Sequence, residues 1–339
     1  MIPVENIYYM LSYAFKVLNE KGYEKVGLEE FENVLELCSE ILICGISIQI
    51  KRGLDREYIS NTDLLSSIRG KIDVSETIKT NSLLKNKLVC SYDEFSVDCY
   101  SNQILKTTLE LLLRLDLSKS RKKEIRNILV YFREVSTLDL YHINWNVHFY
   151  KNNQSYRMLI SICYMIVKGF IQTNSEGNMK LMDFIDEQTM PHLYEKFILE
   201  YYRKEFPELK VSCSQIDWNL DDDFSFMLPI MQSDIMISNG KKTLIIDAKY
   251  YSHMVQSRFD SKTVHSNNLY QIFTYVKNKD AHHSGDVSGM LLYARSDEGL
   301  DLDNVYSMSG NQIFVKSLNL NCDFNSIKKQ LNQICIDVF

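Results

Sequence analysis

The dipeptide Asn239-Gly240, set between two apolar and β-branched runs, constrains this chain more than any other feature. The runs are Ile235–Ile237 and Thr243–Ile246. An Asn-Gly pair between such runs is the strongest short-range signal for a β-hairpin, because both central residues of a type I′ turn need positive φ. We therefore predict a hairpin with Asn239-Gly240 as a two-residue turn and with Ser238 opposite Lys241.

Side chains alternate between the two faces of a strand, so the predicted hairpin has two unlike faces. Asp234, Asp247 and Lys249 fall on one face. The other face is apolar and carries Ile235, Ile237, Leu244, Ile246 and Ala248. In the predicted register Asp234 lies opposite Ile245 and diagonal to Asp247. Two carboxylates and one ammonium group therefore gather at one end of a hairpin whose other face is buried.

The polar side chains on this hairpin are of the kinds that a magnesium site uses. Two convergent carboxylates repel each other unless a cation lies between them. We predict that Asp234, Asp247 and the backbone carbonyl of Ala248 bind Mg²⁺, with ligand distances of about 2.0–2.1 Å and several retained waters. Lys249 would orient or deprotonate a water, or hold a scissile phosphate. The alternative is a surface hairpin with an ordinary Asp–Lys ion pair, which contributes little to stability.

Asp234 followed by Asp247-Ala248-Lys249 resembles the PD-(D/E)xK nuclease motif. Gln271 and Tyr275, within YQIFTY, resemble the Q-x-x-x-Y element of its RecB-like branch. The proline of the motif's name is displaced, since Pro229 does not directly precede Asp234. The resemblance implies a C-terminal α/β nuclease fold, a mixed sheet flanked by helices, which hydrolyses phosphodiester bonds with Mg²⁺.

Two further helices offer side chains to this site. Gln271 and Tyr275 are four residues apart, hence on one face of a helix predicted over Asn268–Val276. Gln271 would hydrogen-bond a catalytic water or a phosphate, and Tyr275 would pack the helix or contact the substrate backbone. The nuclease resemblance also implies an acid on the helix predicted over Thr189–Phe206, where Glu195 is a candidate metal ligand. An exposed helix glutamate is the alternative for Glu195.

The chain before this region reads as a separate α+β half. Apolar residues at helical spacing predict helices over Ile2–Leu18, Glu29–Cys44, Gln103–Leu115, Arg121–Val135 and Tyr156–Ile171. The alternation in Ile46–Ile50 predicts a strand. The polar segment Thr173–Lys180, TNSEGNMK, is the best linker candidate. We therefore place a boundary between an N-terminal domain, residues 1–172, and a C-terminal domain, residues 173–339.

Two Arg-Gly pairs, Arg52-Gly53 and Arg69-Gly70, lie in a polar strand-and-turn region of the N-terminal half. Glycine after arginine allows a tight turn that projects the arginine outward. Such an arginine can stabilise developing negative charge in the nucleotide site of a neighbouring protein. For either residue singly, an ion pair with a nearby acid such as Asp55 or Asp73 is the more ordinary interpretation. The chain has no P-loop motif, so a nucleotide would be bound by a partner.

The composition bears on how the chain binds DNA and on the cellular compartment that we expect for it. The formal net charge is −6 at pH 7, whereas a protein that grips DNA by itself usually carries a basic balance. We therefore expect another subunit to hold the nucleic acid. The eight cysteines show no C-x-x-C pair and read as small hydrophobic residues of a reducing, cytoplasmic protein. The sequence start does not read as a signal peptide, no stretch reads as a membrane span, and no membrane partner is expected.

Several segments, in the same order, resemble the McrC family, the nuclease subunits of McrBC modification-dependent restriction systems. They are IPVENIYYMLSYAF near the start, KRGLDREY and IRGKI in the middle, and IIDAKYY with HSNNLYQ near the end. The resemblance implies that the N-terminal domain docks to a hexameric McrB-like AAA+ GTPase, which binds GTP and recognises DNA containing 5-methylcytosine. It also implies that this chain stimulates GTP hydrolysis and that its C-terminal domain is a DNA endonuclease. A stand-alone RecB-like DNA exonuclease and a catalytically silent AAA+ activator are the alternatives.

Overall fold

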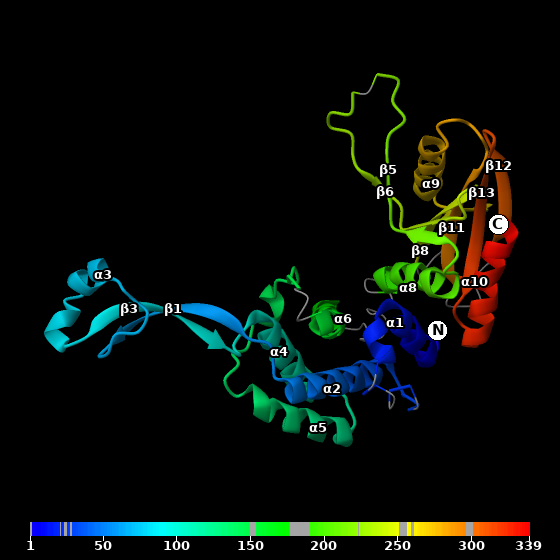
Figure 1. Ribbon diagram of the computed structural model, residues 1–339. Coiled ribbons are helices and arrows are strands. Elements are labelled where there is room, and N and C mark those ends of the chain that lie inside the picture. Colours follow the sequence, from blue (N-terminus) through cyan, green and yellow to red (C-terminus); the bar gives the residue numbers. More distant parts are fainter. Residues whose placement is uncertain are drawn as a thin grey trace. The chain divides into compact units, whose positions relative to one another are not determined.

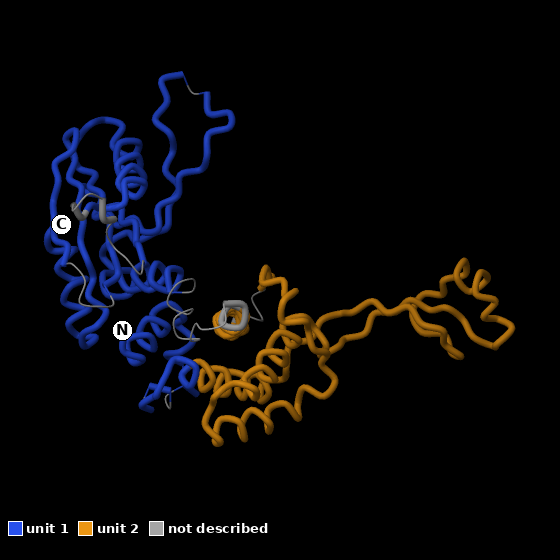
Figure 2. Tube along the Cα trace, turned by 180° about the vertical axis from the view of Figure 1, so that it is seen from behind, with its two compact units in different colours: residues 1–37, 172–339 blue, residues 38–171 orange. Residues whose placement is uncertain are grey.

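The chain divides into two compact units (Figure 2). The computed structural model describes residues 2–20, 22–23, 26–27, 29–149, 154–176, 190–222, 224–250, 256–258, 261–295 and 301–339. Unit 1 comprises Met1–Leu37 and Gln172–Phe339, and unit 2 comprises Cys38–Ile171. Unit 1 therefore contains the predicted catalytic hairpin.

Unit 1 is built on a six-stranded mixed sheet with the strand order β12-β13-β11-β8-β7-β4 (Figure 1). These strands are β4 (Lys210–Ser212), β7 (Ile235–Ser238), β8 (Thr243–Lys249), β11 (Val287–Arg295), β12 (Asp303–Met308) and β13 (Asn311–Asn319). β11 runs parallel to β8 and β13, whereas β7, β4 and β12 pair antiparallel with their neighbours. The central strands are apolar on both sides, because helices cover both faces of the sheet.

Helices flank this sheet, as the sequence predicted (Figure 1). α9 (Ser266–Lys279) covers one face, and α8 (Met190–Glu205) and α10 (Phe324–Val338) cover the other. Tyr202 Oη on α8 donates to the backbone oxygen of Leu331 on α10 at 3.0 Å. On the α9 face, a Cβ built at Gly289 of β11 would lie 2.7 Å from Val276 and 2.8 Å from Ile272. Glycine at this position therefore lets α9 pack directly against the sheet.

The described part of unit 1 also contains two short antiparallel ribbons and a 3₁₀ turn. They are β5 (Gln215–Ile216) with β6 (Met231–Gln232), β9 (Gln256–Arg258) with β10 (Ser261–Thr263), and η1 (Lys16–Asn19). The β5–β6 ribbon leads directly into the hairpin formed by β7 and β8.

Residues 1–37 belong to unit 1, so the division differs from the predicted boundary at this end of the chain. α1 (Val4–Ala14) packs against α8. Asn6 Nδ2 donates to the backbone oxygens of Leu320 at 2.9 Å and Cys322 at 2.7 Å. Tyr13 Oη donates to Glu205 Oε1 at 2.6 Å. These contacts join residues between 192 and 316 positions apart, and local sequence patterns carry no signal for them.

Unit 2 combines helices with a three-stranded antiparallel sheet of order β1-β3-β2, consistent with an α+β half. Its elements are α2 (Val34–Arg52), β1 (Glu57–Leu65), β2 (Lys71–Ile72), α3 (Val74–Lys79), η2 (Ser82–Lys85), β3 (Leu88–Ser96), α4 (Tyr100–Arg114), α5 (Lys119–Leu129), η3 (Val130–Phe132), η4 (Leu140–His142) and α6 (Gln154–Glu176). α2 begins in unit 1 and α6 ends in it. The helices bury the core of this unit, and β1 and β3 form a ribbon with α3 at its far end (Figure 1).

The strand predicted over Ile46–Ile50 is wrong, because these residues lie within α2. Leu42, Ile46 and Gln49 are all buried, and their spacing is that of one helix face. Apolar residues at positions 46, 48 and 50 satisfy strand alternation as well as part of a helical repeat. These residues are helical because they continue the apolar helix that precedes them.

The linker predicted over Thr173–Lys180 is helical in its first part, since α6 extends to Glu176. The remainder of that segment lies outside the described residues. The unit boundary falls between Ile171 and Gln172, one residue from the predicted position. Among the helices that the structure describes, none combines the length and the apolar character needed to cross a membrane.

Candidate active site

The hairpin forms where the sequence predicts it, but in a different register. Ser238 pairs with Thr243 and not with Lys241. Gly240 has φ +90°, whereas Asn239 does not have positive φ, so the predicted type I′ turn at Asn239-Gly240 is wrong. Asn239 Oδ1 instead accepts hydrogen bonds from the backbone N–H groups of Lys241 at 3.0 Å and Lys242 at 2.8 Å. These side-chain bonds move the tip of the turn one residue along the chain.

This change of register brings the two predicted acids closer together. In each pair, the sum of the two residue numbers is two higher than predicted. Because this difference is even, each side chain keeps its predicted face. The pairing of Ile235 with Ile246 now places Asp234 opposite Asp247 at the end of the ladder. Asp234 Oδ2 accepts the backbone N–H of Ala248 at 3.0 Å. The two carboxylates therefore face each other directly and not diagonally.

Asp247 is a buried carboxylate without the hydrogen bonds that burial normally requires. Its exposed fraction is 1%, and within the described part of the chain neither carboxylate oxygen accepts a hydrogen bond from a neutral group. Lys249 Nζ lies 2.9 Å from Asp247 Oδ1 as an ion pair. Burial, reinforced by the negative charge of Asp234 and opposed by Lys249, raises the pKa of Asp247 to about 7. This is the electrostatic conflict that a bound cation would relieve.

The donor set fits a magnesium ion. Two carboxylates converge, and the buried oxygens of Asp247 accept no hydrogen bond from a neutral group among the described residues. Over the same residues no cluster of three or more His, Cys, Asp or Glu side chains is arranged to hold a metal. A site limited to two carboxylates suits Mg²⁺, which keeps several waters. The backbone carbonyl of Ala248 remains the predicted third ligand.

Glu195 lies within electrostatic range of the hairpin acids. Burial and the charge of Asp234 raise the pKa of Glu195, and His192 and Lys249 oppose this shift. His192 Nδ1 lies 3.6 Å from Glu195 Oε2, and the Glu195 side chain is 34% exposed. The structure thus brings Glu195 of α8 toward Asp234, and its role as a metal ligand stays a prediction.

A chain of polar side chains links β8 to α9. Lys249 Nζ donates to Gln271 Oε1 at 3.5 Å, and Gln271 Nε2 donates to Tyr275 Oη at 2.9 Å. The Lys249 side chain is 18% exposed, so most of its stem is packed and its ammonium group has little freedom. Gln271 and Tyr275 therefore set the position of Lys249, which sits beside Asp247.

The two predicted arginines, Arg52 and Arg69, belong to unit 2. Arg52 is exposed at the end of α2, before Gly53 with φ +91°. Arg69 precedes Gly70 with φ +70°. Its guanidinium carbon lies 4.0 Å from the centre of the Tyr92 ring, and its Nη2 lies 3.5 Å from Glu94 Oε1. The acid beside Arg69 is thus Glu94 and not Asp73.

One basic residue near the site was missed by the sequence analysis. Arg295 is the last residue of β11. β11 runs parallel to β8 with Leu291 beside Asp247 and Tyr293 beside Lys249. Alternation then places Arg295 on the same face as the hairpin acids. The available signal was an arginine at the carboxyl end of an apolar strand.

Comparisons with known proteins agree with the fold. Residues 4–294 match the family described as McrBC 5-methylcytosine restriction system component. The chain is 31% identical over 346 residues to an Escherichia coli (strain K12) protein described as type IV methyl-directed restriction enzyme EcoKMcrBC, covering 100% of this chain and 97% of that protein. One solved structure is described as a refined half-complex from a tetradecameric assembly of Thermococcus gammatolerans McrB AAA+ hexamers with bound McrC. Its match covers 99% of this chain and 76% of that chain, with a TM-score of 0.52 and 16% identity, and this likeness indicates a shared fold.

Proposed function

The chain belongs to the McrBC 5-methylcytosine restriction system component family, and from this premise we propose that it is the Mg²⁺-dependent DNA endonuclease subunit of such a system. The observation that carries the proposal is the facing pair Asp234 and Asp247, beside Lys249. The site has the order of elements of a PD-(D/E)xK nuclease: helix, hairpin with two acids and a lysine, then a helix with Gln271.

Each residue of this site has a definite task in phosphodiester hydrolysis. Asp234, Asp247 and the carbonyl of Ala248 would hold Mg²⁺, with Glu195 as an accessory ligand. The ion supplies Lewis-acid polarisation of the phosphate and neutralises charge there. Lys249 holds its ammonium group beside Asp247 and directs it at the attacking water or at the scissile phosphate. Gln271 and Tyr275 keep Lys249 in that position through their hydrogen bonds.

The direct test is cleavage of methylated and unmethylated plasmid by the purified chain. The reaction is run with Mg²⁺ or with EDTA, and with or without the AAA+ GTPase of the same system and GTP. We expect cleavage only with Mg²⁺, the partner, GTP and methylated DNA together. Cleavage by the chain alone would favour a stand-alone nuclease. Absence of cleavage, together with intact stimulation of the GTPase, would favour a silent activator.

Metal binding should depend on pH because Asp247 holds a proton below about pH 7. The pKa is raised, so the metal-free carboxyl is neutral on the acid side, and Mg²⁺ must displace that proton. Mg²⁺ affinity measured by calorimetry should therefore fall about tenfold per pH unit below pH 7 and change little above it. The Asp247→Asn protein should lose this dependence. Equal wild-type affinities at about pH 6 and about pH 8 would contradict the assignment.

Unit 2 is proposed to dock to the AAA+ partner and to stimulate its GTP hydrolysis. The family membership supports a partner of this kind, since the matched Thermococcus gammatolerans assembly is described as McrB AAA+ hexamers with bound McrC. The ribbon of unit 2 exposes a pair of aromatic side chains, Tyr58 at 74% and Phe95 at 52%, whose ring centres are 4.9 Å apart. Exposed apolar side chains that lie together are typical of protein–protein contact. The net charge of −6 also fits a subunit that reaches DNA through a partner.

Arg69→Ala should lower the stimulated GTPase rate about tenfold, the usual effect of losing one charged hydrogen bond at an interface. Arg52→Ala should lower it as well, in the same coupled assay. A loss of roughly 10³–10⁵ would instead indicate direct stabilisation of charge on the nucleotide. Arg56→Ala is the matched control, because Arg56 also lies over an aromatic ring of the ribbon, at 5.9 Å from Phe95. Unchanged stimulation by both Arg52 and Arg69 variants, with co-elution intact, would contradict this role.

A further inference from the structure

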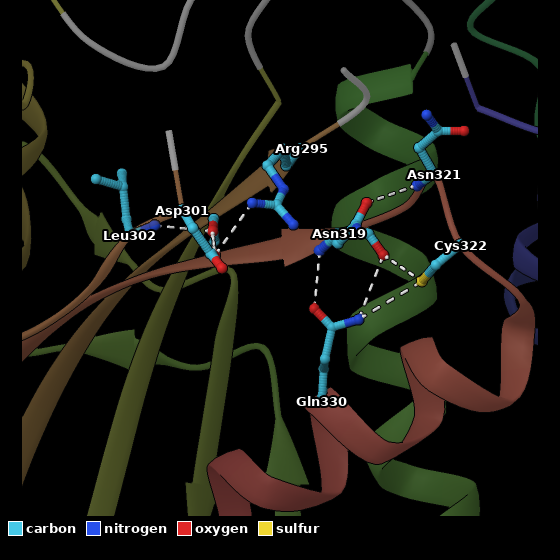
Figure 3. A network of polar contacts seen from close by, with 8 residues as sticks. Arg295, Asp301, Leu302, Asn319, Asn321, Cys322 and Gln330 are labelled. Atoms are coloured by element: carbon cyan, nitrogen blue, oxygen red, sulfur yellow. Dashed lines mark hydrogen bonds and ion pairs between the residues drawn. The ribbon is translucent and has the colours of Figure 1, made fainter. Parts of the chain in front are cut away.

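Arg295 has an environment that an ordinary structural ion pair does not explain. Its side chain is only 17% exposed, and Nη1 lies 3.3 Å from Asp301 Oδ1. Asp301, by contrast, is 76% exposed. The Arg295 Nε is buried, and within the described residues it has no acceptor. Within the described residues, a packed guanidinium group is thus paired with a solvent-exposed acid (Figure 3).

The register of the sheet places the backbone of Arg295 near the proposed catalytic residues. Tyr293 pairs with Lys249 across the parallel strands β11 and β8, and Arg295 is two residues further along β11. With a rise of about 3.3 Å per residue and a strand separation of about 4.8 Å, the Cα atoms of Arg295 and Lys249 are about 8 Å apart. Arg295 therefore lies one step beyond Lys249 on the same face, at the carboxyl ends of the strands.

The neighbours of Asp301 confirm which face the pair occupies. Asp301 Oδ1 also accepts Ser317 Oγ at 2.9 Å, and Ser317 pairs with Tyr293. Tyr293 contacts α9 through a hydrogen bond of 3.1 Å from Asn268 Nδ2 to its Oη. The Arg295–Asp301 pair thus stands on the α9 face of the sheet, which is also the face of Asp247 and Lys249.

We propose that Arg295 binds a backbone phosphate of the DNA strand being cut, next to the scissile phosphodiester, and that Asp301 occupies the guanidinium group until DNA displaces it. The proposal rests on the nuclease function proposed above. A guanidinium group offers five donors in a planar fork that matches phosphate oxygens. Asp301 occupies only the Nη1 donor of the guanidinium group. Because its carboxylate is exposed, water can replace the guanidinium group around it at little cost when a phosphate displaces Asp301. A phosphate that replaces Asp301 could accept from Nη1 and Nη2 together, at the end of the planar fork.

This proposal predicts opposite effects for the two members of one ion pair. Arg295→Met should weaken DNA binding about tenfold through the loss of one charged contact. It should also reduce the slope of log affinity against log salt by about one. Asp301→Asn removes the competing carboxylate and a repelling charge, so it should strengthen DNA binding about two- to fivefold. A purely structural pair would give variants that both destabilise the protein and do not strengthen binding.

A second ion pair of the same sheet supplies matched controls. Lys316 lies on β13 with 14% exposure and pairs with Asp303 at 3.0 Å, and Asp303 is 75% exposed. Lys316 also pairs with Asp337 of α10 at 2.8 Å, so it stands on the opposite face. Lys316→Met and Asp303→Asn change net charge as the test variants do, with the same burial. Both controls should alter DNA affinity less than about twofold.

Binding is measured by fluorescence anisotropy of a labelled DNA duplex with the full-length chain in complex with its AAA+ partner, with Ca²⁺ replacing Mg²⁺ and salt varied from about 50 to about 200 mM. Unchanged affinity and salt slope for Arg295→Met would overturn the proposal, as would weaker binding by Asp301→Asn. If Arg295→Met does not fold, the sign of the Asp301→Asn effect alone decides. If the wild type neither binds the duplex nor cuts DNA with its partner, the nuclease function itself fails. Wild-type binding and cutting, with an ineffective Arg295→Met change, would remove this assignment only.

Discussion

The Asp247→Asn protein is expected to fold and to bind its partner, but to cut DNA at least about 10³-fold more slowly than the wild type. The proposed metal site has two carboxylates, and the substitution removes the charge of the more buried one. Loss of several kcal/mol of charge stabilisation at the reacting phosphate corresponds to that rate factor. Single-turnover cleavage of methylated plasmid, with the partner and GTP, measures the effect. Cutting at more than a tenth of the wild-type rate would contradict the assignment.

The same substitution should make the metal-free protein more stable at about pH 8, by about 1–3 kcal/mol. The folded-state pKa of Asp247 is raised from 3.8 to about 7. The stability that this carboxyl contributes is therefore present at low pH and is lost as pH rises through about 7. The advantage of Asp247→Asn should appear between about pH 4 and pH 7, in denaturant titrations with EDTA.

Asp280→Asn is the matched control for both measurements. Asp280 is also buried, at 4% exposure. It accepts hydrogen bonds from Asn311, Ser284 and Gly285, which overcome the cost of burial and lower its pKa to about 2. A lowered pKa contributes stability above about pH 4 that is lost as pH falls toward 2, so this substitution should cost about 2 kcal/mol at neutral pH. Cleavage should persist. The two Asp→Asn changes are thus expected to have opposite effects on stability.

Lys249→Ala should slow cleavage by about 10²–10³, the usual effect of losing a charged transition-state contact. Lys249 sits 2.9 Å from Asp247 Oδ1 and within hydrogen-bond distance of Gln271, so the substitution removes the ammonium group that lies beside the proposed metal site. Metal affinity should not fall in parallel, because the substitution removes a cation from beside the proposed metal. Calorimetry with Mn²⁺ and single-turnover cleavage at saturating Mg²⁺ separate the two effects.

Lys242→Ala serves as the control for Lys249. Lys242 belongs to the same hairpin but lies near its tip, where Nζ donates to the backbone oxygen of Val338 at 2.9 Å. Cleavage by this variant should equal that of the wild type. If Lys249→Ala also cuts at the wild-type rate with saturating Mg²⁺, Lys249 has no part in the chemistry.

The sequence predicted correctly which face of a strand each residue lies on, but it did not predict the register of the hairpin. Alternation assigned Asp234, Asp247 and Lys249 to one face, and that assignment holds because the register differs by two residues. The type of turn depends on whether Asn239 takes part through a positive-φ backbone or through hydrogen bonds to its side chain. Its Oδ1 accepts two backbone N–H groups, and this local competition between turn types is not resolved by the dipeptide alone.

The sequence by itself determined the hairpin, the candidate acids, the Gln271 helix and the family, because each depends on spacing within a short segment. Only the tertiary structure placed Asp234 opposite Asp247, brought Glu195 toward them and moved residues 1–37 into unit 1. It alone also placed Arg295 beside Lys249, through a parallel pairing between strands that α9 separates along the chain. Contacts of this kind depend on which strands pair and in what register. Burial and packing across the whole sheet decide that, and no local pattern encodes it.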